Sequence, residues 1–152
     1  MIDAIRAYFA VIDSPPEDET ARLRVLGTAL DQLSSAYAAV VETPFVDGED
    51  PPDHHDYEAT CERVRQAFPK FGFYAVVAPT PDPEAEVMMG DAIDDLADIA
   101  LDLDPIVWLW DQGREGEAAW YFQLTYRQHW GTHLHDLRRY VHQCYLHNLG
   151  YA

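Results

Sequence analysis

Two segments in the second half of the chain carry side chains that can bind metal ions or exchange protons. In the first segment, four aspartates recur at intervals of three or four residues: Asp91, Asp95, Asp98 and Asp102. In the second segment, His129 and His133 are four residues apart, and Asp136 and Tyr140 continue the same spacing. Side chains at this spacing lie on one face of an α-helix, so each segment is expected to present one polar strip.

The two segments are expected to form the arms of a long antiparallel helix hairpin over residues 88–145, joined by a tight, glycine-containing turn. Residues at equal distances from the turn lie at similar heights in such a hairpin. Asp98 is then level with His129, and Asp95 is level with His133. One handedness of the hairpin brings both polar strips to the seam between the helices, whereas the other turns both to solvent. The sequence leaves both hands open.

Two interpretations of this seam compete. In the structural one, an aspartate accepts a hydrogen bond from a histidine across the helix pair, which fixes the register and raises the pKa of the histidine. In the functional one, a divalent ion is coordinated by side chains from both helices, namely Asp95, Asp98, His129 and His133. Carboxylate–histidine pairs need no metal, so the structural network is preferred and no cofactor is expected. A divalent metal ion is the alternative.

Three further helices are predicted before this hairpin, because apolar residues recur there every three or four positions. The first covers about residues 2–13. The second is expected to start with Ser14 as its N-cap and to end near Val41. The third is expected to start with Asp53 as its N-cap and to run to about Phe68.

Residues 71–78 (FGFYAVVA) favour an extended conformation, and the prolines that follow prevent a helix until about Ala85. No partner strand is evident, so an extended strap across the helices is expected. Pro105 is expected to kink the next helix, with Asp104 as a local cap. The sequence therefore predicts a single all-α domain over residues 1–152: a bundle of about five helices with a long C-terminal antiparallel helix hairpin and a short extended strap.

The charge of the chain limits its partners. Its 27 acidic residues outnumber the 10 Lys and Arg residues, which gives a formal net charge of −17. Such a field repels phosphate backbones and anionic lipid headgroups, so neither a nucleic acid nor a membrane is an expected partner. A basic protein is a possible partner, and the sequence does not define the oligomeric state. The isolated cysteines Cys61 and Cys144 and the lack of a long apolar run favour a cytoplasmic protein with free thiols.

Aromatic residues crowd the closed end of the predicted hairpin. Trp108 and Tyr121 project from the polar sides of their helices, and an exposed aromatic pair on an acidic surface is typical of a protein-binding patch. Capping of the bundle end by residues 78–86 explains the same pattern equally well.

Three sequence features resemble a bacterial family of small proteins known as domain of unknown function 5063. They are DDLADI at residues 94–99, the Trp-rich start of the last helix, and HWGTHLHD at residues 129–136. The resemblance is strongest over about residues 88–142. It implies an all-helical cytoplasmic protein and conveys no activity.

Known enzyme motifs fit the chain poorly. Asp94, Asp95 and Asp98 spell the DDxxD of isoprenoid synthases, but the chain is too short for their substrate cavity and has no second acidic motif. It also has no Gly-rich phosphate loop and no G-x-S-x-G elbow. A non-enzymatic protein-binding or adaptor role is therefore the leading hypothesis. The alternative is a divalent-metal-binding protein or a metal-dependent hydrolase that uses the Asp/His seam.

Overall fold

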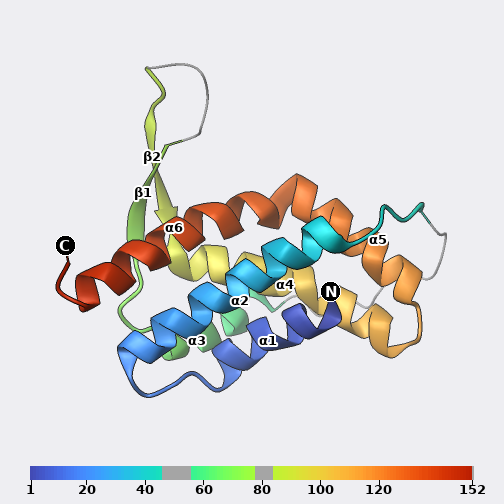
Figure 1. Cartoon of the computed structure of the whole chain (residues 1–152), viewed down its shortest axis with the longest axis horizontal. Coiled ribbons are helices and arrows are strands. Elements are labelled where there is room, and N and C mark those ends of the chain that lie inside the picture. Colours follow the sequence, from blue (N-terminus) through green and yellow to red (C-terminus); the bar gives the residue numbers. More distant parts are fainter. Residues whose placement is uncertain (46–55, 78–83, 152) are drawn as a thin grey trace.

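The computed structural model describes residues 1–45, 56–77 and 84–151, and all elements below belong to these parts of the chain. Helices dominate, and two strands form a small antiparallel sheet (Figure 1). In chain order the elements are α1 (Ile2–Asp13), α2 (Glu19–Ala39), α3 (Tyr57–Ala67), β1 (Phe73–Val77), β2 (Val87–Asp91), α4 (Ala92–Asp111), α5 (Glu115–Thr125), the π-helical turn η1 (Tyr126–Trp130) and α6 (Gly131–Asn148). The predicted all-α class is confirmed, and there are about five helices because α5, η1 and α6 follow one another without a break. No helix among the described residues is long and apolar enough to cross a membrane.

Helix α4 lies at the centre of the bundle and contacts α1, α3, α5 and α6. Its apolar stripe is fully enclosed, as its spacing predicts, at Leu96, Ile99, Leu103 and Ile106. Complete burial of each such side chain contributes about 1.5–3 kcal/mol to folding. The stripe therefore fixes the rotation of α4, and with it the direction in which the neighbouring aspartates point.

The N-caps of two helices differ from those expected. Helix α2 begins after Asp18, whose carboxylate accepts a hydrogen bond from the Ala21 N–H at 2.7 Å. Ser14, the expected cap, still belongs to the end of α1, because its N–H is bonded to the Ala10 carbonyl. Helix α3 is capped by Asp56, and the expected cap at residue 53 lies outside the described residues. In both helices an aspartate immediately before the first turn satisfies an otherwise unpaired N–H.

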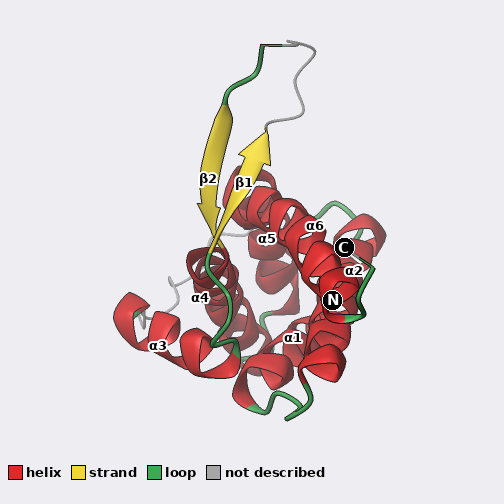
Figure 2. Cartoon of the chain, turned by 90° about the vertical axis from the view of Figure 1, so that its left-hand side faces the viewer, coloured by secondary structure: helices red, strands yellow, loops and turns green. Residues whose placement is uncertain are grey.

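The expected strap is instead one strand of a β-hairpin, so the prediction of an unpaired extended segment is wrong. Strands β1 and β2 pair antiparallel, with Phe73 opposite Asp91 and Val77 opposite Val87. The predicted start of the fourth helix near residue 88 is wrong for the same reason, because residues 87–91 form β2. Gly90 permits this pairing: a Cβ at that position would lie 2.8 Å from the Tyr74 ring. The hairpin projects away from the helices (Figure 2).

The turn between α4 and α5 and the helices on either side of it form the predicted C-terminal hairpin. Gly113 adopts a φ of 75°, a left-handed conformation that favours glycine. It lies midway between the end of α4 at Asp111 and the start of α5 at Glu115. Helix α4 continues through Pro105 to Asp111, so the helix does not break at the proline. The π-helical turn at residues 126–130 was not expected from the sequence.

Candidate metal centre

The polar strips of α4 and of the long C-terminal helix meet at the seam between them. Of the two hands that the sequence allows, the structure has the one that turns both strips inward, because aspartates of α4 contact His129 and His133 across the seam. All four sequence-predicted seam residues come together there: Asp95, Asp98, His129 and His133. Asp102, which continues the aspartate row, joins them.

Two histidine–aspartate hydrogen bonds span the seam. Nδ1 of His133 lies 2.6 Å from Oδ1 of Asp95, and Nδ1 of His129 lies 2.7 Å from Oδ2 of Asp102. An ionised carboxylate can only accept, so each Nδ1 carries the hydrogen and donates it. In a neutral imidazole Nε2 then holds the free lone pair, which is the form that a metal ion requires.

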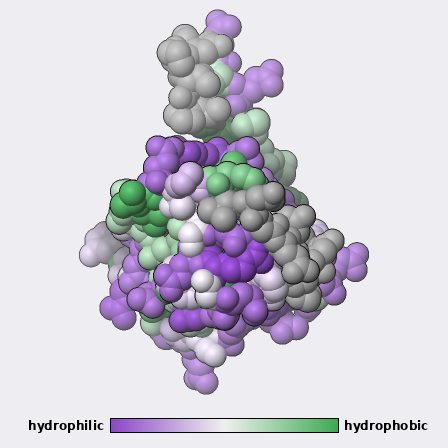
Figure 3. All heavy atoms as spheres, turned by 90° about the vertical axis from the view of Figure 1, so that its right-hand side faces the viewer, coloured by the Kyte–Doolittle hydropathy of each residue, from purple (hydrophilic) through white to green (hydrophobic). Residues whose placement is uncertain are grey.

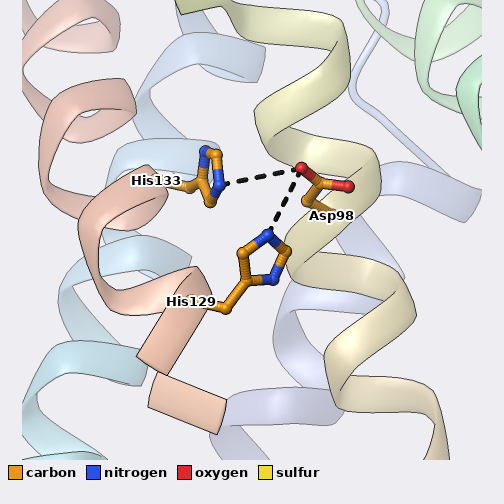
Figure 4. A group of neighbouring side chains, drawn as sticks. All are labelled: Asp98, His129 and His133. Carbon is orange, nitrogen blue, oxygen red and sulfur yellow. Dashed lines mark ion pairs between the residues drawn. The ribbon is translucent and has the colours of Figure 1, made fainter. Parts of the chain in front are cut away.

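Asp98 lies across the seam from the two histidines and faces both of them (Figure 4). Its Oδ2 is 3.7 Å from Nε2 of His133 and 3.8 Å from Nε2 of His129. The three ligand atoms all lie within 4.8 Å of one another. The expected pairing of Asp95 with His133 is therefore observed, whereas the nearest carboxylate to His129 is that of Asp102 rather than Asp98.

The seam concentrates negative charge. Burial, followed by the nearby Asp94 carboxylate, raises the pKa of Asp98. The hydrogen bond to Asp95 raises the pKa of His133 above its usual 6.5. Within the described parts of the chain, histidines are the only ion-pair partners of Asp95, Asp98 and Asp102. A cation placed among these carboxylates would relieve their mutual repulsion.

The site is accessible from one side. The side chain of Asp95 is 7% exposed, whereas that of His129 is 48% exposed. Asp98 and His133 are intermediate between these two. The Asp95 carboxylate is thus buried. The three converging ligand atoms of Asp98, His129 and His133 lie near the surface, where an ion and its water ligands can reach them.

Strand β1 supports the site from the side of the sheet. The Tyr74 hydroxyl donates a hydrogen bond to Oδ2 of Asp95, the oxygen that does not accept from His133. The Tyr74 ring also stacks on Tyr140 of α6, with centroids 4.7 Å apart. Asp95 is therefore held by both of its oxygens, and this fixes the orientation of the His133 ring. No sequence pattern indicated this role for Tyr74, because it depends on the β-hairpin.

The π-helical turn η1 sets the position of His129. Such turns insert an extra residue into a helix and often lie at functional sites. Gly131 accommodates this one, because a Cβ there would lie 2.4 Å from the Tyr126 carbonyl oxygen. The turn is anchored by Trp130, which is fully buried and donates from Nε1 to the Thr125 hydroxyl at 2.9 Å. In the sequence, the one indication of this π-helical turn is Gly131, which lies between His129 and His133 in the predicted helix.

The aromatic pair predicted at the closed end of the hairpin is less exposed than expected. Trp108 and Tyr121 are half-buried and pack against the core. Trp108 also lies under the Arg114 guanidinium, whose carbon is 5.6 Å from the ring centroid. Both rings are thus partly exposed, and Arg114 covers one side of Trp108.

The fold and the seam define a class: small helical-bundle proteins with a projecting β-hairpin and a carboxylate–histidine cluster between two antiparallel helices. Residues 7–147 match the family described as Domain of unknown function (DUF5063), and the chain belongs to this family. The expected resemblance is thus confirmed over nearly the whole chain.

The fold is similar to that of a solved structure, the crystal structure of protein BF1032 from Bacteroides fragilis. The TM-score is 0.75 at 15% sequence identity, and the similarity covers 94% of this chain and 88% of that one. At this identity the likeness shows a common fold. No curated protein matches the chain.

Proposed function

We propose that the protein binds a divalent metal ion through Asp98, His129 and His133. The observation that supports this best is the convergence of three ligand atoms: two imidazoles, each oriented by its own aspartate, direct Nε2 toward the same oxygen of Asp98. Asp95, which the sequence grouped with the ligands, takes the role of an outer carboxylate that orients His133. Metal-binding histidines commonly have such a partner.

A purely structural network explains this arrangement less well. The two Nδ1 hydrogen bonds already join the helices, and they do not require both Nε2 atoms to face Asp98. The separations of 3.7 and 3.8 Å are too long for hydrogen bonds. Ligands of one ion at the usual Zn–N distance of about 2.0–2.1 Å lie roughly 3–4 Å from one another, and the two separations from Asp98 fall in this range.

The ligand set narrows the choice of ion. Two imidazoles and one carboxylate suit Zn²⁺, Mn²⁺ or Fe²⁺. Three protein ligands leave at least one coordination position for water, and a bound ion lowers the pKa of such a water. Metal-dependent hydrolysis is therefore a narrower proposal for the same site.

Metal titration of protein purified without an affinity tag tests the proposal, with a chelating dye as competitor and Zn²⁺, Mn²⁺ and Mg²⁺ as ions. We expect one site per chain, and His129→Ala or Asp98→Asn lowers the affinity by about 100-fold or more. His142→Ala is the matched control, because His142 is an exposed residue of α6 outside the seam. Equal affinities in all variants would assign the aspartates and histidines to a structural network.

A non-enzymatic protein-binding or adaptor role is the second candidate. It is supported by the net charge of −17 and by the exposed apolar side chains of the β-hairpin. On the face shown in Figure 3, hydrophilic residues predominate and hydrophobic ones gather in separate areas. A basic protein is the proposed partner, and no nucleic acid or membrane is proposed. A cytoplasmic location is part of the same proposal, supported by the free thiols of Cys61 and Cys144.

A further inference from the structure

The outer face of the β-hairpin is apolar and uncovered. The register places Phe73, Ala75 and Val77 of β1 on one face of the sheet, together with Val87 and Met89 of β2, and with Asp91 at the end next to α4. Phe73 is 71% exposed, Met89 is 73% exposed and Val87 is 68% exposed. The opposite face differs, because Tyr74 packs there against α6. A two-stranded hairpin with such a face gains stability from a further layer or strand.

The outward edge of β1 also carries unpaired backbone groups. The Ala92 N–H donates to the Gly72 carbonyl at 3.2 Å, which makes this pair a hydrogen-bonded one in the register of the sheet. Hydrogen-bonded pairs alternate with non-bonded ones in an antiparallel ladder. The N–H and C=O groups of Phe73, Ala75 and Val77 therefore point away from β2. In the described parts of the chain they meet no backbone partner.

A groove of about 250 Å³ runs beside this strand, between β1 and α6. Its β1 wall is formed by residues 74–77, and its α6 wall includes Asp136, Arg139 and Gln143. Helix α6 thus leaves room beside β1 instead of closing against its edge. An extended segment that enters the groove finds backbone donors and acceptors on one wall and polar side chains on the other.

The charge of the hairpin and of the first turn of α4 indicates what kind of segment fits. Residues 73–95 contain six acidic residues and no Lys or Arg. On the α6 wall, Arg139 is accompanied by Asp136, so the groove itself adds no net positive charge. A second copy of this chain would bring the same acidic stretch against itself, whereas a basic segment is attracted to it.

We propose that the free edge of β1 binds an extended segment of a basic partner protein, which pairs with it as a third strand. Alternate apolar side chains of that segment lie beside Phe73 and Val77 on the outer face, and the intervening Lys or Arg side chains face the groove and Asp136. This inference rests on the protein-binding role and is independent of the metal site.

The test uses the whole chain and a fluorescein-labelled nine-residue peptide of alternating Lys and Val, with a Glu/Val peptide as its counterpart. Ala75→Pro removes one outward N–H from the β1 edge. Met89→Pro is the matched control, because Met89 is opposite Ala75 and its N–H points to the other edge. Neither substitution removes a hydrogen bond between the two strands, and edge strands tolerate such a proline.

We expect the Lys/Val peptide to bind at least about tenfold more tightly than the Glu/Val peptide. Ala75→Pro should weaken the affinity for the Lys/Val peptide by about tenfold, whereas Met89→Pro should change this affinity by less than about threefold. In the unsubstituted protein, the peptide should shift the amide resonances of Phe73, Ala75 and Val77, so the test does not depend on the variant folding. Equal binding to Ala75→Pro with unshifted β1 amides overturns the inference but leaves a protein-binding role elsewhere. No binding of the Lys/Val peptide contradicts both the strand-pairing inference and the proposed binding of a basic partner protein. A dimer that Ala75→Pro dissociates overturns it in favour of a second copy.

Discussion

Replacing Asp95 by Asn separates a metal site from a structural hydrogen-bond network. The substitution keeps the shape of the side chain and removes the charge that orients His133 through a 2.6 Å hydrogen bond. Asp95 does not face the proposed ion, so the substitution removes none of the three ligand atoms and acts through the orientation of His133. Loss of such an outer carboxylate typically lowers metal affinity by about 10–100-fold, or about 1.4–2.8 kcal/mol.

The effect is read as the difference in stability with and without the ion. At an ion concentration of about 100 times the dissociation constant, binding stabilises the native state by about 2.7 kcal/mol. A 100-fold loss of affinity reduces that increment to about 0.4 kcal/mol at the same concentration. For a chain of this length, 1 kcal/mol corresponds to a shift of about 2–4 °C in Tm. The metal-induced shift is then about 5–11 °C in the unsubstituted protein and about 1 °C in the variant.

Thermal unfolding monitored by circular dichroism, with Zn²⁺ or with EDTA, provides the assay. Asp31→Asn is the matched control, because Asp31 also loses a charge and a paired partner, Arg138, but lies outside the seam. Both variants lose some stability without metal. If the metal-induced shift is as large in Asp95→Asn as in Asp31→Asn, the reasoning about the outer carboxylate is refuted.

Three further predictions concern the π-helical turn, the charge of His133 and the contact with β1. Gly131→Ala should destabilise the fold by about 1–3 kcal/mol in urea unfolding, because its Cβ would collide with the Tyr126 carbonyl, whereas Gly116→Ala should not, since nothing surrounds that position. The raised pKa of His133 stabilises the metal-free fold fully below pH 6.5, and this contribution is lost as the pH rises through the raised value. Urea unfolding between about pH 6 and 9 should show that decline in the unsubstituted protein and lack it in His133→Gln; a decline of the same size in both would contradict this. Tyr74→Phe should lower metal affinity less than Asp95→Asn and speed amide exchange in β1, since it removes one of the two hydrogen bonds to Asp95; unchanged exchange would argue against the coupling.

The helices and the seam could be predicted because their information is periodic. The intervals between Leu96, Ile99, Leu103 and Ile106 define one buried face, and the aspartates follow it at a constant offset. A short turn then sets the heights of the two arms, which is why the expected approach of Asp95 to His133 is observed. The handedness of the hairpin depends on packing against α1, α2 and α3. The spacing of residues within each arm does not determine it.

Features that depend on contacts distant in sequence could not be predicted in this way. Residues 87–91 continue a helical pattern, and they become a strand because β1 supplies hydrogen-bond partners and Tyr74 requires Gly90 opposite it. The π-helical turn shifts the phase of the last helix, so His129 meets Asp102 rather than Asp98. Exposure of Trp108 was overestimated because the turn residue Arg114 folds back over its ring.

The most direct measurement of the central claim is anomalous diffraction from crystals of the tag-free protein grown with Zn²⁺ or Mn²⁺, collected at the absorption edge of the ion. We predict one strong peak per chain, bounded by Oδ2 of Asp98 and Nε2 of His129 and His133, at about 2.0–2.2 Å from each after a small inward movement of the side chains. Asp98→Asn crystals should lose this peak. A seam without anomalous signal at saturating ion, or a peak bound only by exposed residues elsewhere, would contradict the assignment.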